Sequence, residues 1–197
     1  GNSGAGGAIR MIGGFTTEEN QDRATGGAVE LSSGPSRSGT SGHVAINTAN
    51  AGASGESGAI LVSTGTTSTG SSGGLSLSTG EASGGSGGNI ELMVGTGNIG
   101  DGGSVKLQAG KTMSPQGKGG SVQVYAGAGT NIDGGSGGHI VMRAGLGGGA
   151  NNTGPGGQVV ISAGNSNRGV GGDMALEGGT ARTRTGGSVM LRSGKST

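Results

Sequence analysis

The two histidines, His43 and His139, have the most versatile side-chain chemistry in this sequence, since imidazole acts as an acid, a base and a metal ligand near neutral pH. They occupy equivalent places in two copies of an internal repeat, six repeats apart. If the repeats stack as paired strands, the two side chains would lie about 29 Å apart. We therefore expect no metal or substrate to be shared between them.

Carboxylates suggest a second chemistry, calcium binding. Asp101, Asp133 and Asp173 each adjoin a pair of glycines, as in calcium-binding nonapeptide solenoids. Only Gly171–Gly179 resembles one such unit, and the nonapeptide period is missing. The acids form no repeated cluster of the kind that a polysaccharide-cleaving β-helix needs, and the absence of cysteine excludes thiolate ligands. We expect no enzyme activity, no cofactor and no metal.

Two binding functions are less well supported by the residue pattern. Nucleic-acid binding requires a basic stripe with aromatic residues, but Tyr125 is the single aromatic residue in the alternating segments, so we expect no nucleic-acid partner. Ice binding requires a flat row of identical short polar side chains, which the repeats lack, although loop residues such as Thr64, Thr66 and Thr67 leave it as an alternative. No apolar run approaches the length of a membrane-spanning helix, so we expect no membrane insertion.

The feature that positions all these residues is a short alternating segment that recurs twelve times, with the consensus [Gly/Ser]-Gly-x-Φ-x-Φ-x-small-Gly, where Φ is a large apolar residue. The first Φ residues are Ile9, Val29, Val44, Ile60, Leu75, Ile90, Val105, Val122, Ile140, Val159, Met174 and Val189. The second Φ residues are Met11, Leu31, Ile46, Val62, Leu77, Leu92, Leu107, Val124, Met142, Ile161, Leu176 and Leu191. Such period-two alternation is typical of a strand with one buried face.

This repeat predicts an all-β fold, a single-domain β-solenoid over residues 1–197. Successive repeats are about 15 to 20 residues apart, which gives about twelve rungs with parallel strands in register. The bracketing glycines predict turns with positive φ or close backbone approach. The glycine-rich return loops are expected to be partly polyproline II-like, and the first rung carries a longer loop at 14–25. With 54 glycines and 28% apolar residues, the core would be thin.

Charge is divided between the two halves of the chain. Residues 1–105 carry eight acids and three bases, whereas residues 106–197 carry three acids and nine bases. The chain begins and ends inside loops, and joining the two partial loops preserves the repeat spacing. This predicts head-to-tail association of copies, or an excerpt of a longer array. The candidate end-to-end contact residues are Arg182, Arg184, Arg192, Lys195, Glu18, Glu19 and Asp22.

Segments 57–88 and 102–127 resemble the glycine-rich GGxVxLxAG arrays of large extracellular proteins from microalgae and other protists, and of some phage and bacterial fibre proteins. The resemblance implies an extracellular or cell- or virion-surface location and a structural role. Our first hypothesis is a subunit or segment of a filament or appendage that assembles by end-to-end β-stacking. The alternatives are a receptor- or glycan-binding adhesive fibre protein and an ice-binding solenoid. Asn151 lies in an Asn-Asn-Thr sequon, a candidate N-glycosylation site.

Overall fold

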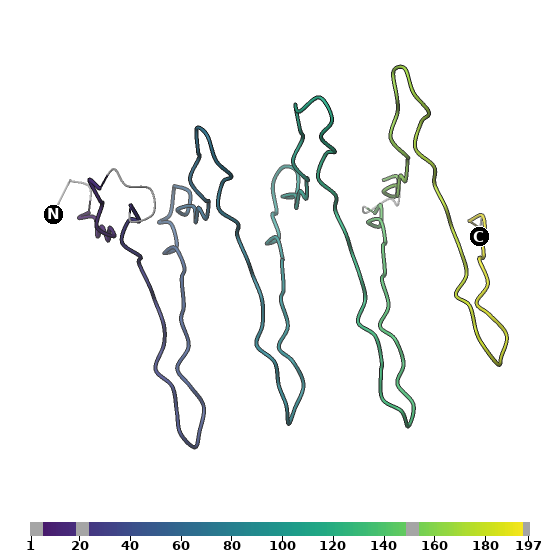
Figure 1. Cartoon of the computed structure of the whole chain (residues 1–197), viewed down its shortest axis with the longest axis horizontal. Helices are drawn as coiled ribbons and strands as arrows, with labels where there is room; N and C mark the ends of the chain where they lie inside the picture. The colour runs from purple at the N-terminus through teal and green to yellow at the C-terminus, as the bar shows by residue number, and fades with distance from the viewer. Residues whose placement is uncertain (1–5, 19–23, 149–153, 195–197) are drawn as a thin grey trace. The chain divides into compact units, whose positions relative to one another are not determined.

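The computed structural model describes residues 6–18, 24–148 and 154–194. Long extended stretches alternate with tight reversals of the chain (Figure 1). Neither a helix nor a strand occurs in these three ranges; the backbone there consists of irregular extended stretches, turns and bends. The two units into which the chain divides, Gly1–Leu92 and Met93–Thr197, share this character.

The predicted β-solenoid is therefore wrong. A solenoid requires each alternating segment to pair along its length with the next one and to shield its two apolar side chains. None of the described segments does either: none is a strand, and no apolar residue among them is buried. The accessible surface is 20092 Å², whereas a compact chain of 18.3 kDa would expose about 8,100 Å².

The physical reason lies in how little each repeat can bury. Removing two large aliphatic side chains from water contributes about 3–6 kcal/mol. The conformational entropy of ordering about four residues already offsets that contribution. Each repeat is several times longer than that, and many of its residues are glycine, which loses the most conformational freedom on ordering. The alternating pattern fixes which side chains share a side of the chain, but it supplies nothing to cover them.

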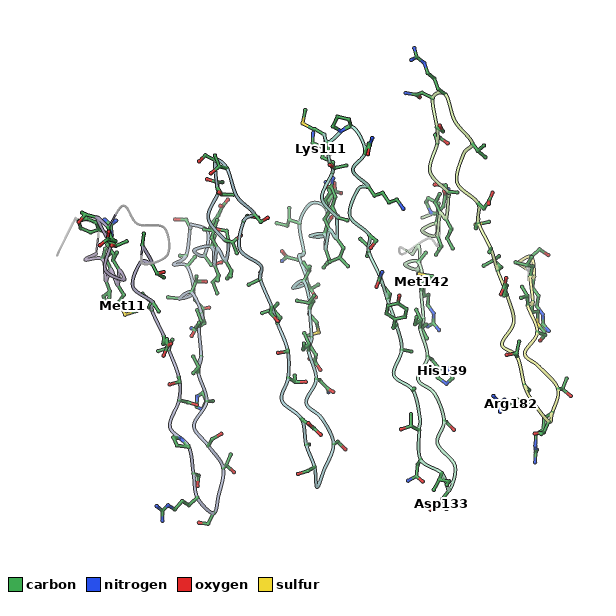
Figure 2. The ribbon with its side chains drawn as sticks, in the orientation of Figure 1. Met11, Lys111, Asp133, His139, Met142 and Arg182 are labelled. Carbon is green, nitrogen blue, oxygen red and sulfur yellow. The ribbon has the colours of Figure 1, made fainter. Side chains whose placement is uncertain are left out.

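Local order is concentrated in the loops. The reversal between Gly127 and Gly138 illustrates it: Asp133 lies at the tip of the loop, and the chain returns through His139 toward Met142 (Figure 2). The backbone N–H of Gly138 donates to the carbonyl oxygen of Gly127 at 2.8 Å, which joins the two legs of the loop at its base. At the tip, the N–H of Asp133 donates to Asn131 Oδ1 at 2.8 Å.

A recurring hydrogen bond shapes three of the shorter loops. The N–H of a glycine donates to the hydroxyl oxygen of a serine or threonine three residues earlier. In each of these loops the glycine that ends the preceding alternating segment lies two residues before the serine or threonine. The second residue of the next consensus, also a glycine, lies three residues after the donor glycine. The bonds are Gly39 to Ser36 at 3.0 Å, Gly70 to Thr67 at 3.1 Å and Gly169 to Ser166 at 2.8 Å. Short hydroxyl side chains bond nearby backbone in this way and so favour turns. These loops thus have a defined local geometry without a core beneath them.

Positive φ is confined to loop tips. Among the described glycines it occurs at Gly100, with φ of 76°, and at Gly134, with φ of 115°. Neither belongs to the bracketing glycines of the alternating segments, for which positive φ was one of two expectations. The other expectation, close backbone approach, holds at seven of the described loop bases, where one bracketing glycine donates a backbone hydrogen bond to another.

Candidate functional site

Two features recur along the chain and are the candidate functional elements. We call the two Φ residues of each repeat its apolar pair. We call the base of each loop its neck, formed by the last residue of the consensus (the closing residue) and the second residue of the next one (the entry glycine). In the repeat that begins at Gly102, for example, Val105 and Leu107 are the apolar pair, and Gly110 and Gly120 form the neck that follows.

The apolar pairs are exposed to solvent. The first members retain about half of their accessible surface, from 48% at Val44 to 61% at Val29 apart from the terminal Ile9, and the second members are mostly more exposed, as with Leu107 at 72%. Successive side chains of an extended chain point to opposite sides. Each repeat therefore presents its two large apolar groups on one side, and no other described part of the chain buries them.

The necks are where backbone approaches backbone. In seven of them the N–H of the entry glycine donates to the carbonyl oxygen of the closing glycine, at 2.7–3.0 Å. Nine described residues are half-buried, and six of these immediately precede a closing residue. The six are Gly13, Ser33, Thr48, Ala109, Ala144 and Gly178. The residue before the closing position is thus the most enclosed position of the repeat.

Four of the predicted end-to-end contact residues lie in the described ranges. Arg182, Arg184 and Arg192 are exposed, and Arg182 lies near a reversal of the chain in Figure 2. Glu18 is also exposed, and its backbone N–H donates to Thr16 Oγ1 at 3.1 Å. Nothing in the described residues tests their contact with a second copy.

Four predicted site residues fall outside the described ranges. They are Glu19, Asp22, Asn151 and Lys195. The longer first loop expected at 14–25 is described at its two ends, where Gly27 N–H donates to Gly14 O at 2.7 Å. The glycosylation site and part of the charged contact set therefore stay predictions.

The side chains considered for metal binding do not converge in the described ranges. No group of three or more histidine, aspartate or glutamate side chains there could hold a metal ion. No cavity is found among the described residues. Likewise, none of the described residues belongs to a helix that is long and apolar enough to cross a membrane.

Sequence reasoning located the apolar pairs and the bracketing glycines but missed the necks. It grouped glycine, alanine, serine, threonine and valine together as small residues before the closing position. The signal that could have revealed the necks is the branching of that residue at Cβ, which decides how close two backbones come.

Comparison of the chain with protein-family models, with curated proteins and with solved structures finds no match. The chain's own repeat and its surface are therefore the features that bear on its function.

Proposed function

We propose that this chain is a structural, non-catalytic repeat protein whose copies associate into a filament or surface coat outside the cell. The observation that carries the proposal is the exposure of the apolar pairs. All twenty-four of their side chains lie in described residues, and none is buried. Soluble monomers rarely leave large contiguous apolar surfaces in water, and such surfaces are typical of interaction sites.

A second copy of the chain is the partner that best fits these pairs. It offers the same two side chains at the same spacing, so that apolar groups of two copies can cover one another repeat after repeat. From Ile60 to Val105 the first members are equally spaced along the sequence, which keeps the pairs of aligned copies opposite one another. Burial of these side chains between copies supplies the hydrophobic stabilisation that a single copy lacks.

The charge distribution favours an antiparallel head-to-tail alignment of copies, in which the acidic half of one copy lies beside the basic half of the next and the apolar pairs still face one another. Residues 1–105 have a net charge of −5 and residues 106–197 of +6, counted from their eight acids with three bases and three acids with nine bases. Attraction between unlike halves steers association and sets its direction. Repulsion between like halves disfavours copies that align side by side with their ends in the same direction.

The extracellular placement depends on the style of the repeats. Glycine-rich arrays with hydroxyl-rich loops resemble those of extracellular and fibre proteins. Asn151 is eight or more positions from any apolar pair in the sequence, so a glycan there is expected to leave the pairs accessible.

Sedimentation velocity of the purified chain over a hundredfold range of concentration, with electron microscopy of the same samples, tests the proposal. We expect the sedimentation coefficient to rise with concentration and elongated assemblies to appear in the micrographs. A single monomeric species at every concentration, with no assemblies on the grid, would exclude a self-associating structural role. Glycan-array binding or thermal hysteresis by that monomer would favour the adhesive or ice-binding alternative instead.

A further inference from the structure

The eleven necks between described repeats fall into two kinds. Seven are closed by the hydrogen bond from entry glycine to closing glycine, whereas four have no such bond. The closed necks are Gly14/Gly27, Gly34/Gly42, Gly110/Gly120, Gly127/Gly138, Gly145/Gly157, Gly164/Gly172 and Gly179/Gly187. The open necks are Ala49/Gly58, Gly65/Gly73, Gly80/Gly88 and Gly95/Gly103.

The residue before the closing position separates the two kinds without exception. In the closed necks it is glycine, alanine or serine, namely Gly13, Ser33, Ala109, Ala126, Ala144, Ala163 and Gly178. In the open necks it is β-branched, namely Thr48, Thr64, Thr79 and Val94. We call this position the neck residue.

The contacts at the entry glycines explain the separation. In the closed necks the nearest backbone atom of the closing glycine lies close to where a Cβ of the entry glycine would stand, for example Gly110 N at 3.2 Å from that point on Gly120. In the open necks no backbone atom comes within 4 Å of it. The side chain of the neck residue is there instead, as with Thr48 Cγ2 at 3.5 Å from that point on Gly58.

Loop length does not account for the difference. Eight positions separate the closing residue from the entry glycine in the closed neck Gly164/Gly172 and in the open necks Gly65/Gly73 and Gly80/Gly88. Longer loops also close, as does Gly145/Gly157, which is twelve positions apart. The presence of the hydrogen bond therefore correlates with the identity of the neck residue and not with the length of the loop.

Three neck residues distinguish the effect of the methyl group from that of the hydroxyl group. Ser33 donates its hydroxyl to Gly42 O at 2.8 Å, and its neck is closed. Thr79 donates its hydroxyl in the same way to Gly88 O at 3.3 Å, yet its neck is open. Val94 has no hydroxyl, and its neck is also open. The common property of the open necks is therefore a γ-methyl group on the Cβ of the neck residue, which serine, alanine and glycine lack.

We infer that the neck residue is a built-in conformational determinant: branching at Cβ holds a loop open, and its absence lets the loop close by a backbone hydrogen bond. A β-branched side chain has two heavy atoms on Cβ and few rotamers, so one of them stands between the two backbones. At Gly13 and Gly178 the approach is so close that even a Cβ would collide with the carbonyl oxygen of Gly27 or Gly187.

The determinant divides the chain into regions. The four open necks are consecutive and lie between Ala49 and Gly103, whereas every described neck before and after them is closed. This open region contains four acids, Glu56, Glu81, Glu91 and Asp101, and no base. Its entry-glycine N–H groups make no backbone hydrogen bond within the described chain, so they are accessible to solvent or to another chain.

The test is amide hydrogen exchange, measured by NMR on the full chain at a dilution that keeps it monomeric. In a variant with Thr48, Thr64 and Thr79 changed to Ser and Val94 to Ala, we expect the amides of Gly58, Gly73, Gly88 and Gly103 to exchange about two- to tenfold more slowly, since one hydrogen bond is gained at each. The matched control changes Thr69, Thr130 and Thr183, which lie in the loops at least three positions from any closing or entry residue, to Ser. We expect the control to leave those amides unchanged.

The reverse variant changes Ala109, Ala126, Ala144 and Ala163 to Thr. We expect it to accelerate exchange at Gly120, Gly138, Gly157 and Gly172 by a similar factor and to leave the other closed necks unaltered. Unchanged exchange at the entry glycines in both variants would overturn the inference. This outcome is independent of self-association, so it bears on the necks alone.

Discussion

Replacing Leu75, Leu77, Ile90 and Leu92 by serine is expected to weaken self-association by about a thousandfold. These four side chains form two neighbouring apolar pairs and retain 55–70% of their surface in the single chain. Covering that surface in a partner copy contributes about 1 kcal/mol per side chain, roughly 4 kcal/mol together. A change of about 1.4 kcal/mol alters an association constant tenfold. Sedimentation equilibrium over a wide concentration range measures the change.

The matched control removes four exposed apolar side chains from the opposite side of the chain. Four large, exposed residues each lie between the two members of an apolar pair. They are Leu61, Val141, Val160 and Met190. Changing these four to serine should alter association by less than tenfold. Equal losses in both variants would mean that association depends on total hydrophobicity and has no defined contact side.

Reversing three charges in the basic half is expected to abolish head-to-tail association at low ionic strength. Arg182→Glu, Arg184→Glu and Arg192→Glu would change the net charge of residues 106–197 from +6 to zero. The attraction to the acidic half of the next copy then disappears, while the apolar pairs remain. Light scattering at about 0.01 M salt, where charges act over about 30 Å, should show shorter or no assemblies.

The control for this variant keeps the charge and changes the side chain. Arg182→Lys, Arg184→Lys and Arg192→Lys should associate as the original chain does. The original chain itself should associate more weakly at about 0.15 M salt, where screening shortens the range to about 8 Å. Association of the reversed variant that equals the original at both salt concentrations would exclude a directional role for the charged halves.

The sequence predicted the repeat of this protein better than its fold. Alternation over Val105 and Leu107, repeated twelve times, predicts which side chains share a side of an extended chain. It contains no information about what covers them, because the same pattern serves a strand in a solenoid and an extended segment without a core. The turn chemistry of loops such as Ser36 to Gly39 follows from short-range rules, so sequence alone is sufficient there.

The candidate functional elements, too, were predicted only in part. Glycine at every entry position predicted close backbone approach, and the bond from Gly120 to Gly110 confirms it for that neck. The difference between Ala109 and Thr79 was missed, because both were treated as small residues and the effect of branching at Cβ depends on how closely two backbones approach. The contact between charged halves depends on a second molecule, which no property of one chain reveals.

The closed necks also give the chain a mechanical property. A loop such as Gly145 to Gly157 is bridged by one hydrogen bond of 3.0 Å, while its twelve peptide units can extend to about 40 Å when pulled taut. Each bond contributes only about 1 kcal/mol, so it ruptures under modest tension and re-forms when the tension is released. A molecule stretched between two anchors would first lengthen through Ala49–Gly103, where no backbone hydrogen bond closes a loop and one side-chain bond, from Thr79 Oγ1 to Gly88 O, bridges a loop base, and then release stored length one loop at a time. In single-molecule pulling this appears as a soft initial extension followed by small reversible steps. Each step dissipates energy by breaking one weak hydrogen bond that re-forms later.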